Sequence, residues 1–286
     1  NTLKFNNYVS NKNEIDFRII KRDKSLNNLP SENISLKINN FFTSNKMLNE
    51  FSIYNKLSFF NNISNYTFEH NDNLNNTKKY HNLILSSDIY YNLNEDITPR
   101  IKLIHNQDIY HSNGIVNEDS NSLTFSYQNQ YSDSRFFGND LMDNTSRIVY
   151  GFESDIIIKN QKYDLNLNQS YDFNETNNFN QKINQKSHLS DYALETSAHF
   201  KSFLVNLDLR IDKSSFSRKE MNLNVSTSDP LKISLDYHET QKNAFNENSN
   251  DTEYLGISLE KNINDNLKFA YSSKYRSQKI ILAQYY

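Results

Sequence analysis

Along residues 203–211 hydrophobic and polar residues alternate, except that Leu204 occupies one of the positions between apolar residues. The apolar members of this stretch are Phe203, Val205, Leu207, Leu209 and Ile211. The polar members between them are Asn206, Asp208 and Arg210. A period of two is that of a β-strand with one apolar and one polar face. The pattern recurs along the chain with almost no helical period, so it predicts one large antiparallel sheet whose faces meet different solvents. The fold that suits such a sheet is an all-β, antiparallel transmembrane β-barrel of the outer-membrane type.

Similar stretches give the positions of the other predicted strands. Before about Tyr80 the alternation is weak, and it indicates short strands near residues 15–19, 34–38 and 57–59. Clearer strands are expected at residues 83–93, 101–103, 123–127, 148–158, 163–173, 192–200, 221–225, 231–237, 255–259, 267–271 and 281–285. With roughly ten residues per strand plus connections, the chain has room for about 14 to 16 strands. We see no domain boundary, and residues 1–286 are predicted to form one barrel region.

The overall composition fits this prediction. Only 36% of the residues are hydrophobic and the mean hydropathy is -0.81, which is low for a soluble fold of 286 residues. The 19 Tyr and 19 Phe residues argue against disorder, because disordered chains are poor in aromatic side chains. A barrel reconciles the two observations, since its lumen and loops are polar and only alternate residues in the membrane need be apolar.

Charge and cysteine content exclude several classes of partner and cofactor. The formal net charge is -3, from 31 basic and 34 acidic residues, so no positive excess is available to bind nucleic acid. The chain has no cysteine, which excludes structural disulfides and thiolate metal sites within it.

Sequence signals for catalysis are weak. The seven histidines are scattered, and none lies in a metal-ligand spacing such as His-Glu-x-x-His. Asp191, Glu195 and His199 share the expected lumen face of one strand, as the acidic and histidine sites of outer-membrane proteases or lipases do. Polar residues line a lumen routinely, and we therefore expect no enzymatic activity, no catalytic or metal-binding residues and no cofactor.

One segment carries a more specific signal. Residues 134–151 read Ser-Arg-Phe-Phe-Gly-Asn-Asp-Leu-Met-Asp-Asn-Thr-Ser-Arg-Ile-Val-Tyr-Gly. This segment resembles the signature of the lipopolysaccharide-assembly LptD family, also called the organic-solvent-tolerance protein family. The family shows an Arg-aromatic-x-Gly-x-Asp core, a short acidic or small-residue stretch, and an Arg-x-x-Tyr-Gly motif that opens a strand. The matching signature residues are Arg135, Phe136, Gly138, Asp140, Asp143, Arg147, Tyr150 and Gly151.

The signature also has a physical interpretation. Gly138 permits a backbone conformation or a close approach that a side chain would forbid. Two arginines beside Asp140 and Asp143 can hold a loop through charge-assisted hydrogen bonds. We therefore expect this loop to fold against the barrel mouth or lumen. Leu141 departs from the family, in which many relatives have Arg at this point.

The resemblance implies transport rather than chemistry. Members of the family receive lipopolysaccharide from a periplasmic Lpt bridge through an N-terminal jellyroll and insert it into the outer leaflet of the Gram-negative outer membrane. The sugar part passes through the lumen, and the lipid leaves through a seam between the first and last strands. The implied partners are lipopolysaccharide, the periplasmic bridge, the lipoprotein plug subunit and membrane lipid. This chain shows no jellyroll and too few strands for the family's full barrel, so we expect an incomplete part of a larger barrel.

Two other functions share some of these features. Another outer-membrane β-barrel channel or porin would show the same alternation, and only residues 135–151 separate it from the lipopolysaccharide transporter. A secreted β-rich adhesin or solenoid should show a fixed internal repeat, and we find none.

Overall fold

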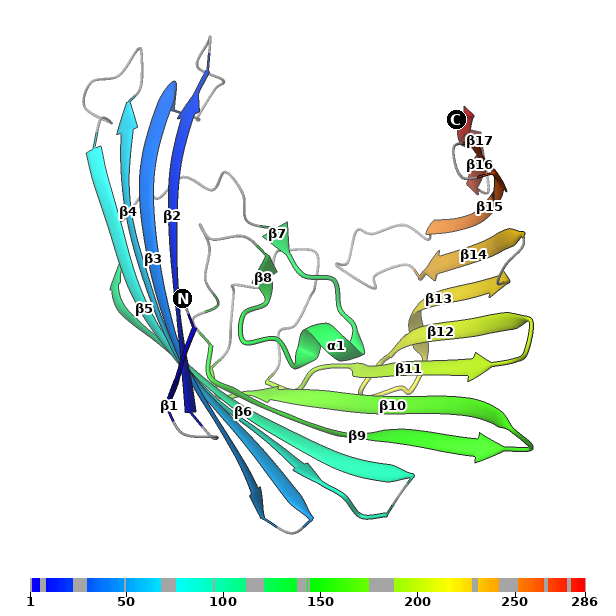
Figure 1. Ribbon diagram of the computed structural model, residues 1–286, viewed down its shortest axis with the longest axis horizontal. Coiled ribbons are helices and arrows are strands. Elements are labelled where there is room, and N and C mark those ends of the chain that lie inside the picture. Colours follow the sequence, from blue (N-terminus) through cyan, green and yellow to red (C-terminus); the bar gives the residue numbers. More distant parts are fainter. Residues whose placement is uncertain are drawn as a thin grey trace. The chain divides into compact units, whose positions relative to one another are not determined.

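The computed structural model describes most of the chain, in fourteen stretches. These are residues 2–5, 9–22, 30–48, 50–67, 76–94, 96–111, 121–137, 143, 145–174, 188–227, 231–241, 252–264, 267–276 and 279–285. Nearly all of them are β-strands (Figure 1). The first six strands are β1 (Thr2–Phe5), β2 (Val9–Lys21), β3 (Glu32–Leu48), β4 (Phe51–Thr67), β5 (Asn76–Tyr91) and β6 (Ile97–His111). Those of the second half are β9 (Arg147–Ile158), β10 (Gln161–Asp172), β11 (Tyr192–His199), β12 (Phe203–Ile211), β13 (Arg218–Thr227), β14 (Lys232–Thr240), β15 (Thr252–Asn264), β16 (Leu267–Arg276) and β17 (Lys279–Tyr285).

These strands form one 15-stranded sheet in which sequence neighbours are also hydrogen-bonded neighbours. The strand number agrees with the predicted 14 to 16. All-β antiparallel architecture is confirmed for the described residues, but the closed barrel is not. The order of the ladder is linear, from β1 to β17, and no described residues join its two ends. A sheet closes only when its last strand pairs with its first, so this chain forms an open sheet.

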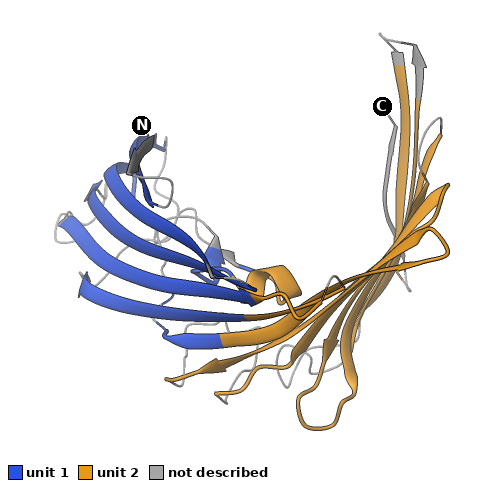
Figure 2. Ribbon diagram, turned by 60° about the horizontal axis from the view of Figure 1, so that its bottom comes forward, with its two compact units in different colours: residues 1–90, 101–123, 132–148 blue, residues 91–100, 124–131, 149–286 orange. Residues whose placement is uncertain are grey.

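The chain consists of two compact units (Figure 2). Unit 1 comprises residues 1–90, 101–123 and 132–148, and unit 2 comprises residues 91–100, 124–131 and 149–286. Both units contribute residues to β6 and β9. No described helix is long and apolar enough to cross a membrane.

In unit 1 the usual relation between polarity and burial is inverted. Ile15 of β2 is 73% exposed, while Lys37 of β3 is 2% exposed. Apolar side chains on the exposed face include Ile15, Phe17, Ile19, Ile34, Leu36, Ile38, Ile63, Leu85, Ile101 and Leu103. Buried polar side chains on the opposite face include Asn33, Ser35, Lys37, Ser58, Asn62, Ser64, Asn82, Ser86 and Asn106. A water-soluble sheet normally buries its apolar face, whereas the described strands of unit 1 expose theirs.

In unit 2 the pairing register of neighbouring strands also keeps apolar and polar side chains on opposite faces of the sheet. Leu207 of β12 is opposite Thr196 of β11 and Leu223 of β13. Asn206, one residue earlier and on the other face, is opposite Ser197 and Asn224. In the part of unit 2 that the structure describes, no second sheet or helix covers the apolar face of β12 at Val205, Leu207 and Leu209.

Turn geometry explains the tight connection between β9 and β10. Lys159 and Asn160 are the only residues between these strands, and both have positive φ angles, of 50° and 64°. Two left-handed residues in a row make the type I′ turn, whose twist matches that of the strands it joins. Asn suits this conformation better than Lys does.

One predicted strand is wrong. Residues 123–127 were expected to alternate within the sheet, but residues 127–130 form a single helical turn, α1 (Tyr127–Gln130). Ser126 caps this turn, because its hydroxyl accepts a hydrogen bond from the Asn129 amide at 3.2 Å. The preceding residues form β7 (Asn121–Ser122), which pairs only with β8 (Phe136–Phe137). The hydrogen bond from the Asn129 amide to Ser126 thus favours a helical turn at residues whose alternation favours a strand.

Candidate functional site

The signature segment contains a buried ion cluster, which lies within unit 1. Asp143 Oδ2 accepts a hydrogen bond from Arg147 Nη1 at 2.7 Å and lies 3.4 Å from Arg135 Nε. Asp143 Oδ1 accepts hydrogen bonds from the amide and the hydroxyl of Thr145. Arg147 Nη2 also donates to the carbonyl oxygen of Ser132. Arg147 is 0% exposed and Asp143 is 1% exposed, so the charges are stabilised by one another rather than by water.

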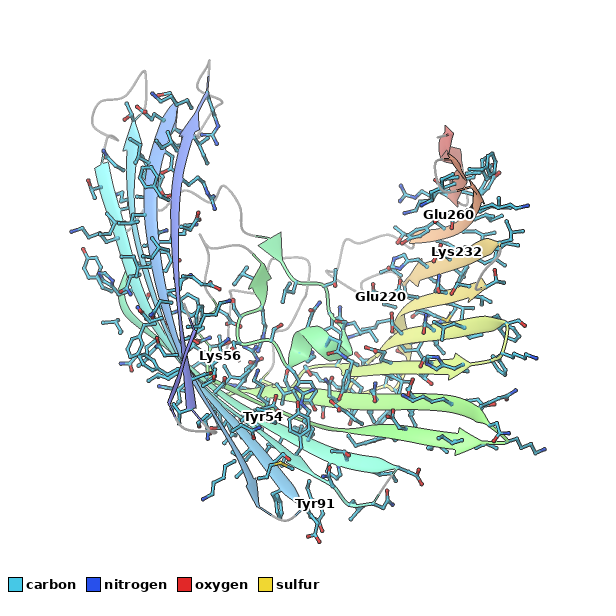
Figure 3. The ribbon with its side chains drawn as sticks, in the orientation of Figure 1. Tyr54, Lys56, Tyr91, Glu220, Lys232 and Glu260 are labelled. Atoms are coloured by element: carbon cyan, nitrogen blue, oxygen red, sulfur yellow. The ribbon has the colours of Figure 1, made fainter. Side chains whose placement is uncertain are left out.

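A second ion cluster in unit 1 tethers the same segment to two strands. Asp133 Oδ2 lies 2.8 Å from Lys56 Nζ of β4, and Asp133 Oδ1 lies 2.8 Å from Lys102 Nζ of β6. Figure 3 shows the side chain of Lys56 on its strand. Burial raises the pKa of Asp133, but the positive charges of Lys102 and Lys56 outweigh burial and lower the pKa from 3.8 to about 2. The carboxylate is therefore charged at any physiological pH.

The lowered pKa gives a pH-dependent stability. The folded pKa lies below the unfolded one, so the contribution of Asp133 is complete above about pH 4 and is lost as the pH falls towards 2. Its size is roughly 2 kcal/mol. Asn resembles a protonated Asp in shape, and we therefore expect Asp133→Asn to be less stable than wild type at pH 6 by this amount. Urea unfolding in micelles should show the two proteins converging near pH 2. An equal difference at both pH values would contradict the assignment.

The remaining signature residues have separate roles or fall outside the described residues. Phe136 lies in β8, next to the ion cluster in sequence. Tyr150 points from the exposed face of β9, and its hydroxyl donates to Gln169 Oε1 at 2.6 Å. Gly138 and Asp140 lie outside the described residues. The predicted arginine–aspartate contact is thus found for Asp143, while that for Asp140 stays a prediction.

Gly151 is required by the close approach of β9 and β10. A Cβ atom at this position would lie 2.1 Å from the carbonyl oxygen of Leu167 and 2.8 Å from the Cα atom of Asn168. Both atoms belong to the backbone, so a side chain would force the two strands apart. The family signature therefore includes a residue whose role is to let two strands pack.

Replacing Gly151 with Ala is expected to destabilise unit 2 by about 3 kcal/mol, a cost typical of overpacking. Gly256→Ala is the matched control, because its nearest neighbour is the Asp236 Cβ atom at 3.3 Å, a side-chain atom that need shift only slightly, and it should cost about 1 kcal/mol or less. Urea midpoints in detergent micelles measure both values. Equal midpoints for the two variants would show that the strand contact at Gly151 is not limiting.

In unit 2, α1 is anchored by a polar cluster that the sequence did not reveal. The Tyr127 hydroxyl donates to Glu153 Oε1 at 2.8 Å, and the same oxygen lies 2.7 Å from Arg100 Nη1. Asn168 Nδ2 donates to the Tyr127 carbonyl oxygen at 2.8 Å. Burial, and then the nearby negative charge, raise the pKa of Tyr127 well above its usual range. The phenol therefore remains protonated and keeps donating to Glu153.

A polar cavity of about 300 Å³ lies beside α1 in unit 2. The residues that line it are Asp96, Thr98, Tyr127, Gln128, Glu153, Ser154, Asp155, Lys162, Asp164, Asn166, Glu195 and Ser197. Carboxylates, amides and hydroxyls thus dominate its walls. Such a surface offers hydrogen bonds to water or to a hydroxyl-rich molecule, and little apolar area.

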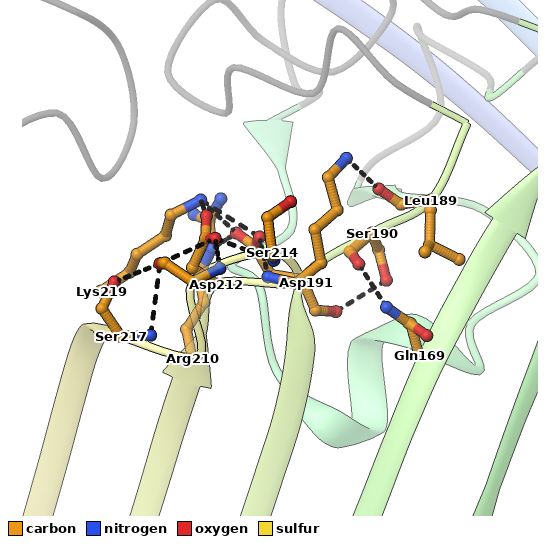
Figure 4. Close-up of polar contacts among 11 residues, drawn as sticks. Gln169, Leu189, Ser190, Asp191, Arg210, Asp212, Ser214, Ser217 and Lys219 are labelled. Atoms are coloured by element: carbon orange, nitrogen blue, oxygen red, sulfur yellow. Dashed lines mark hydrogen bonds and ion pairs between the residues drawn. The ribbon is translucent and has the colours of Figure 1, made fainter.

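A third ion cluster lies at one end of β11 to β13 (Figure 4). Asp191 Oδ2 accepts from Arg210 Nε at 2.7 Å, and Lys219 Nζ lies 3.1 Å from both Asp191 oxygens. Lys219 also contacts Asp212 at 2.5 Å, and Lys213 Nζ donates to the Leu189 carbonyl oxygen at 2.7 Å. The cluster ties the turn after β12 to the chain that enters β11.

The three residues that resembled a catalytic site, Asp191, Glu195 and His199, are spread along β11 and the residue before it. Asp191 precedes the first residue of β11, and His199 is its last residue, so they lie about 26 Å apart at roughly 3.3 Å per residue. His199 Nε2 instead contacts Asp164 Oδ2 at 3.0 Å. Asp191, Glu195 and His199 therefore do not form one site.

Sequence reasoning missed Asp133, Lys56, Lys102, Arg100 and Glu153. Asp133 adjoins the signature, and its proximity to Arg135 was a signal for it. Arg100 had a weaker signal, since Thr98-Pro99-Arg100 before an apolar strand also resembles the family. Lys56, Lys102 and Glu153 had none, because each lies in a strand far from its partner in sequence and carries an ordinary charged side chain.

Together these features define an antiparallel all-β protein that exposes an apolar face in unit 1, buries polar residues on the opposite face there, and contains ion clusters in both units. A search of curated proteins finds no match. Residues 27–267 match the LPS transport system D (LptD) family. The match covers most of the chain and includes the signature segment, so the chain belongs to the LptD family, an outer-membrane family with a role in lipopolysaccharide transport. The predicted resemblance is confirmed.

Proposed function

We propose that this chain carries lipopolysaccharide to the outer leaflet of the outer membrane of a Gram-negative bacterium, as part of the wall of the LPS-assembly translocon. The match to the LptD family over residues 27–267 is the observation that carries this proposal. The inverted distribution of side chains supports it, because the exposed apolar face suits lipid. The polar face suits the sugars and phosphates of the transported molecule.

The proposed partners follow from the same role. They are lipopolysaccharide itself, surrounding membrane lipid, the lipoprotein plug subunit and the periplasmic Lpt bridge. The role proposed for the chain is transport and not catalysis. The separation of Asp191 from His199 supports this, since the acidic and histidine residues that suggested hydrolysis lie at opposite ends of β11.

Depletion of the protein in its host tests the proposal. Newly made lipopolysaccharide, followed by pulse labelling and membrane fractionation, should stop reaching the cell surface and accumulate behind the outer membrane. Re-expression should restore delivery. Normal surface delivery in depleted cells, together with loss of uptake of a small solute, would instead identify a porin or another channel.

A further inference from the structure

The helical turn α1 is too short to be stable alone. It comprises Tyr127–Gln130 and lies over β10 and β11 within unit 2 (Figure 2). Nucleating a helix costs more free energy than one turn returns, so an isolated turn of this length is unfolded in water. The position of α1 therefore depends on what it contacts on the sheet.

Polar contacts help to hold α1 on the sheet of unit 2. Glu153 accepts from the Tyr127 hydroxyl and pairs with Arg100, at 2.8 and 2.7 Å. The Arg100 guanidinium also lies 3.8 Å from the centre of the Tyr131 ring. Asn168 donates a further hydrogen bond to the carbonyl oxygen of Tyr127. Release of α1 would break these interactions, and water can replace the hydrogen bonds among them.

The surface beside α1 is polar and leaves space that water can fill. Tyr127 and Gln128 contribute to one wall of the cavity of about 300 Å³, and Asp164, Asn166 and Glu195 contribute others. A structural element that belongs to a fixed core is normally packed without such voids. The rings of Tyr127 and Tyr131, both buried, are the main apolar surface that opposes its release.

We propose that residues 124–131 form a lid on the polar face of unit 2, latched by Tyr127, Glu153 and Arg100, which lifts when a transported molecule passes. The lid rests on the proposed function, in which a sugar chain follows the polar face and passes the cavity beside α1. In the closed state Tyr127 covers Glu153. In the open state both face the water-filled path.

Tyr127→Phe tests the latch, because it removes one hydroxyl and keeps the ring. The intact protein in planar lipid bilayers should open at least tenfold more often, the effect expected from loss of a hydrogen bond to a charged group. Tyr163→Phe is the matched control. Its hydroxyl donates to Gln161 Oε1 at the same 2.8 Å, away from α1, and its current should be unchanged. Equal opening frequencies for wild type and Tyr127→Phe would overturn the latch.

A covalent bridge tests the lid without weakening the fold. Gln128 of α1 and Glu195 of β11 both line the cavity beside α1, so cysteines at both positions can be joined by a short bis-maleimide. The chain has no cysteine of its own, and the single variants Gln128→Cys and Glu195→Cys serve as controls. The bridged protein should lose its openings, while both controls should keep them after the same treatment. Unaltered openings in the bridged protein would show that α1 does not gate the path.

Lipopolysaccharide delivery, measured in cells on the same variants, separates the two proposals. Currents that respond to the bridge in a protein whose depletion leaves surface lipopolysaccharide unchanged would support the lid and refute the transport role. Blocked delivery on depletion, with currents indifferent to both variants, would refute the lid alone.

Discussion

The substitution Leu207→Lys is expected to prevent assembly of the protein in the outer membrane. Leu207 is at the centre of β12, on the apolar face that continues through Leu223 of β13. A basic side chain on the lipid face costs about 2 to 4 kcal/mol at the middle of the membrane. That is a large fraction of the stability of a folded domain, which is about 5 to 15 kcal/mol. Heat-modifiable mobility in gels, which distinguishes folded from unfolded outer-membrane proteins, measures the assembled fraction.

Asn206→Lys is the matched control for this variant. It introduces the same charge one residue away, on the polar face opposite Ser197 and Asn224, where the ammonium group keeps its water. We expect normal assembly. If Leu207→Lys assembles as well as Asn206→Lys, the exposed apolar face is not in contact with lipid, and the membrane location proposed for this sheet is wrong.

The substitution Asp143→Asn is expected to destabilise the protein by about 3 to 5 kcal/mol, the usual cost of removing one partner from a buried ion pair. Asp143 neutralises Arg147 and Arg135, and all three side chains are buried. Asn keeps the shape of the residue but removes the carboxylate of Asp143 from two buried guanidinium groups. Urea unfolding in micelles should give a clearly lowered midpoint.

Glu14→Gln is the corresponding control at an exposed ion pair. Glu14 lies 2.5 Å from Lys12, a shorter distance than that between Asp143 and Arg147, yet both side chains are well exposed to solvent. Such pairs contribute about 0 to 1 kcal/mol, because water screens them. A similar loss in both variants would mean that burial does not strengthen the Asp143 cluster.

The candidate site shows where prediction from sequence stops. The signature segment identified Arg135, Asp143 and Arg147 as residues that hold a loop, and the structure brings these three together. It gave no role to Gly151 beyond opening a strand. The role in strand packing depends on the backbone of Leu167, which belongs to the next strand. Pairings such as Lys56 with Asp133 span 77 residues of sequence, and no local pattern encodes them.

Most strands of the large sheet, and which of their residues share a face, were determined by the sequence alone. Alternation is a local property of the backbone, since successive side chains point to opposite faces, and residues 203–211 therefore specify their own faces. Even the weak early pattern located β2, β3 and β4, although it gave too short a length for each. Polar residues such as Asn and Ser fill the buried face of these strands, which made their alternation look like loop composition.

Only the tertiary structure decided the ends of the sheet, the course of residues 123–130 and the partners of the charged residues. Each depends on groups distant in sequence: closure needs the last strand to meet the first, and α1 needs Glu153 and Asn168 to hold one helical turn. Period-two patterning fixes which face a side chain occupies. It carries no information about which distant strand lies opposite, because hydrogen bonds between backbones are the same for any pair of strands.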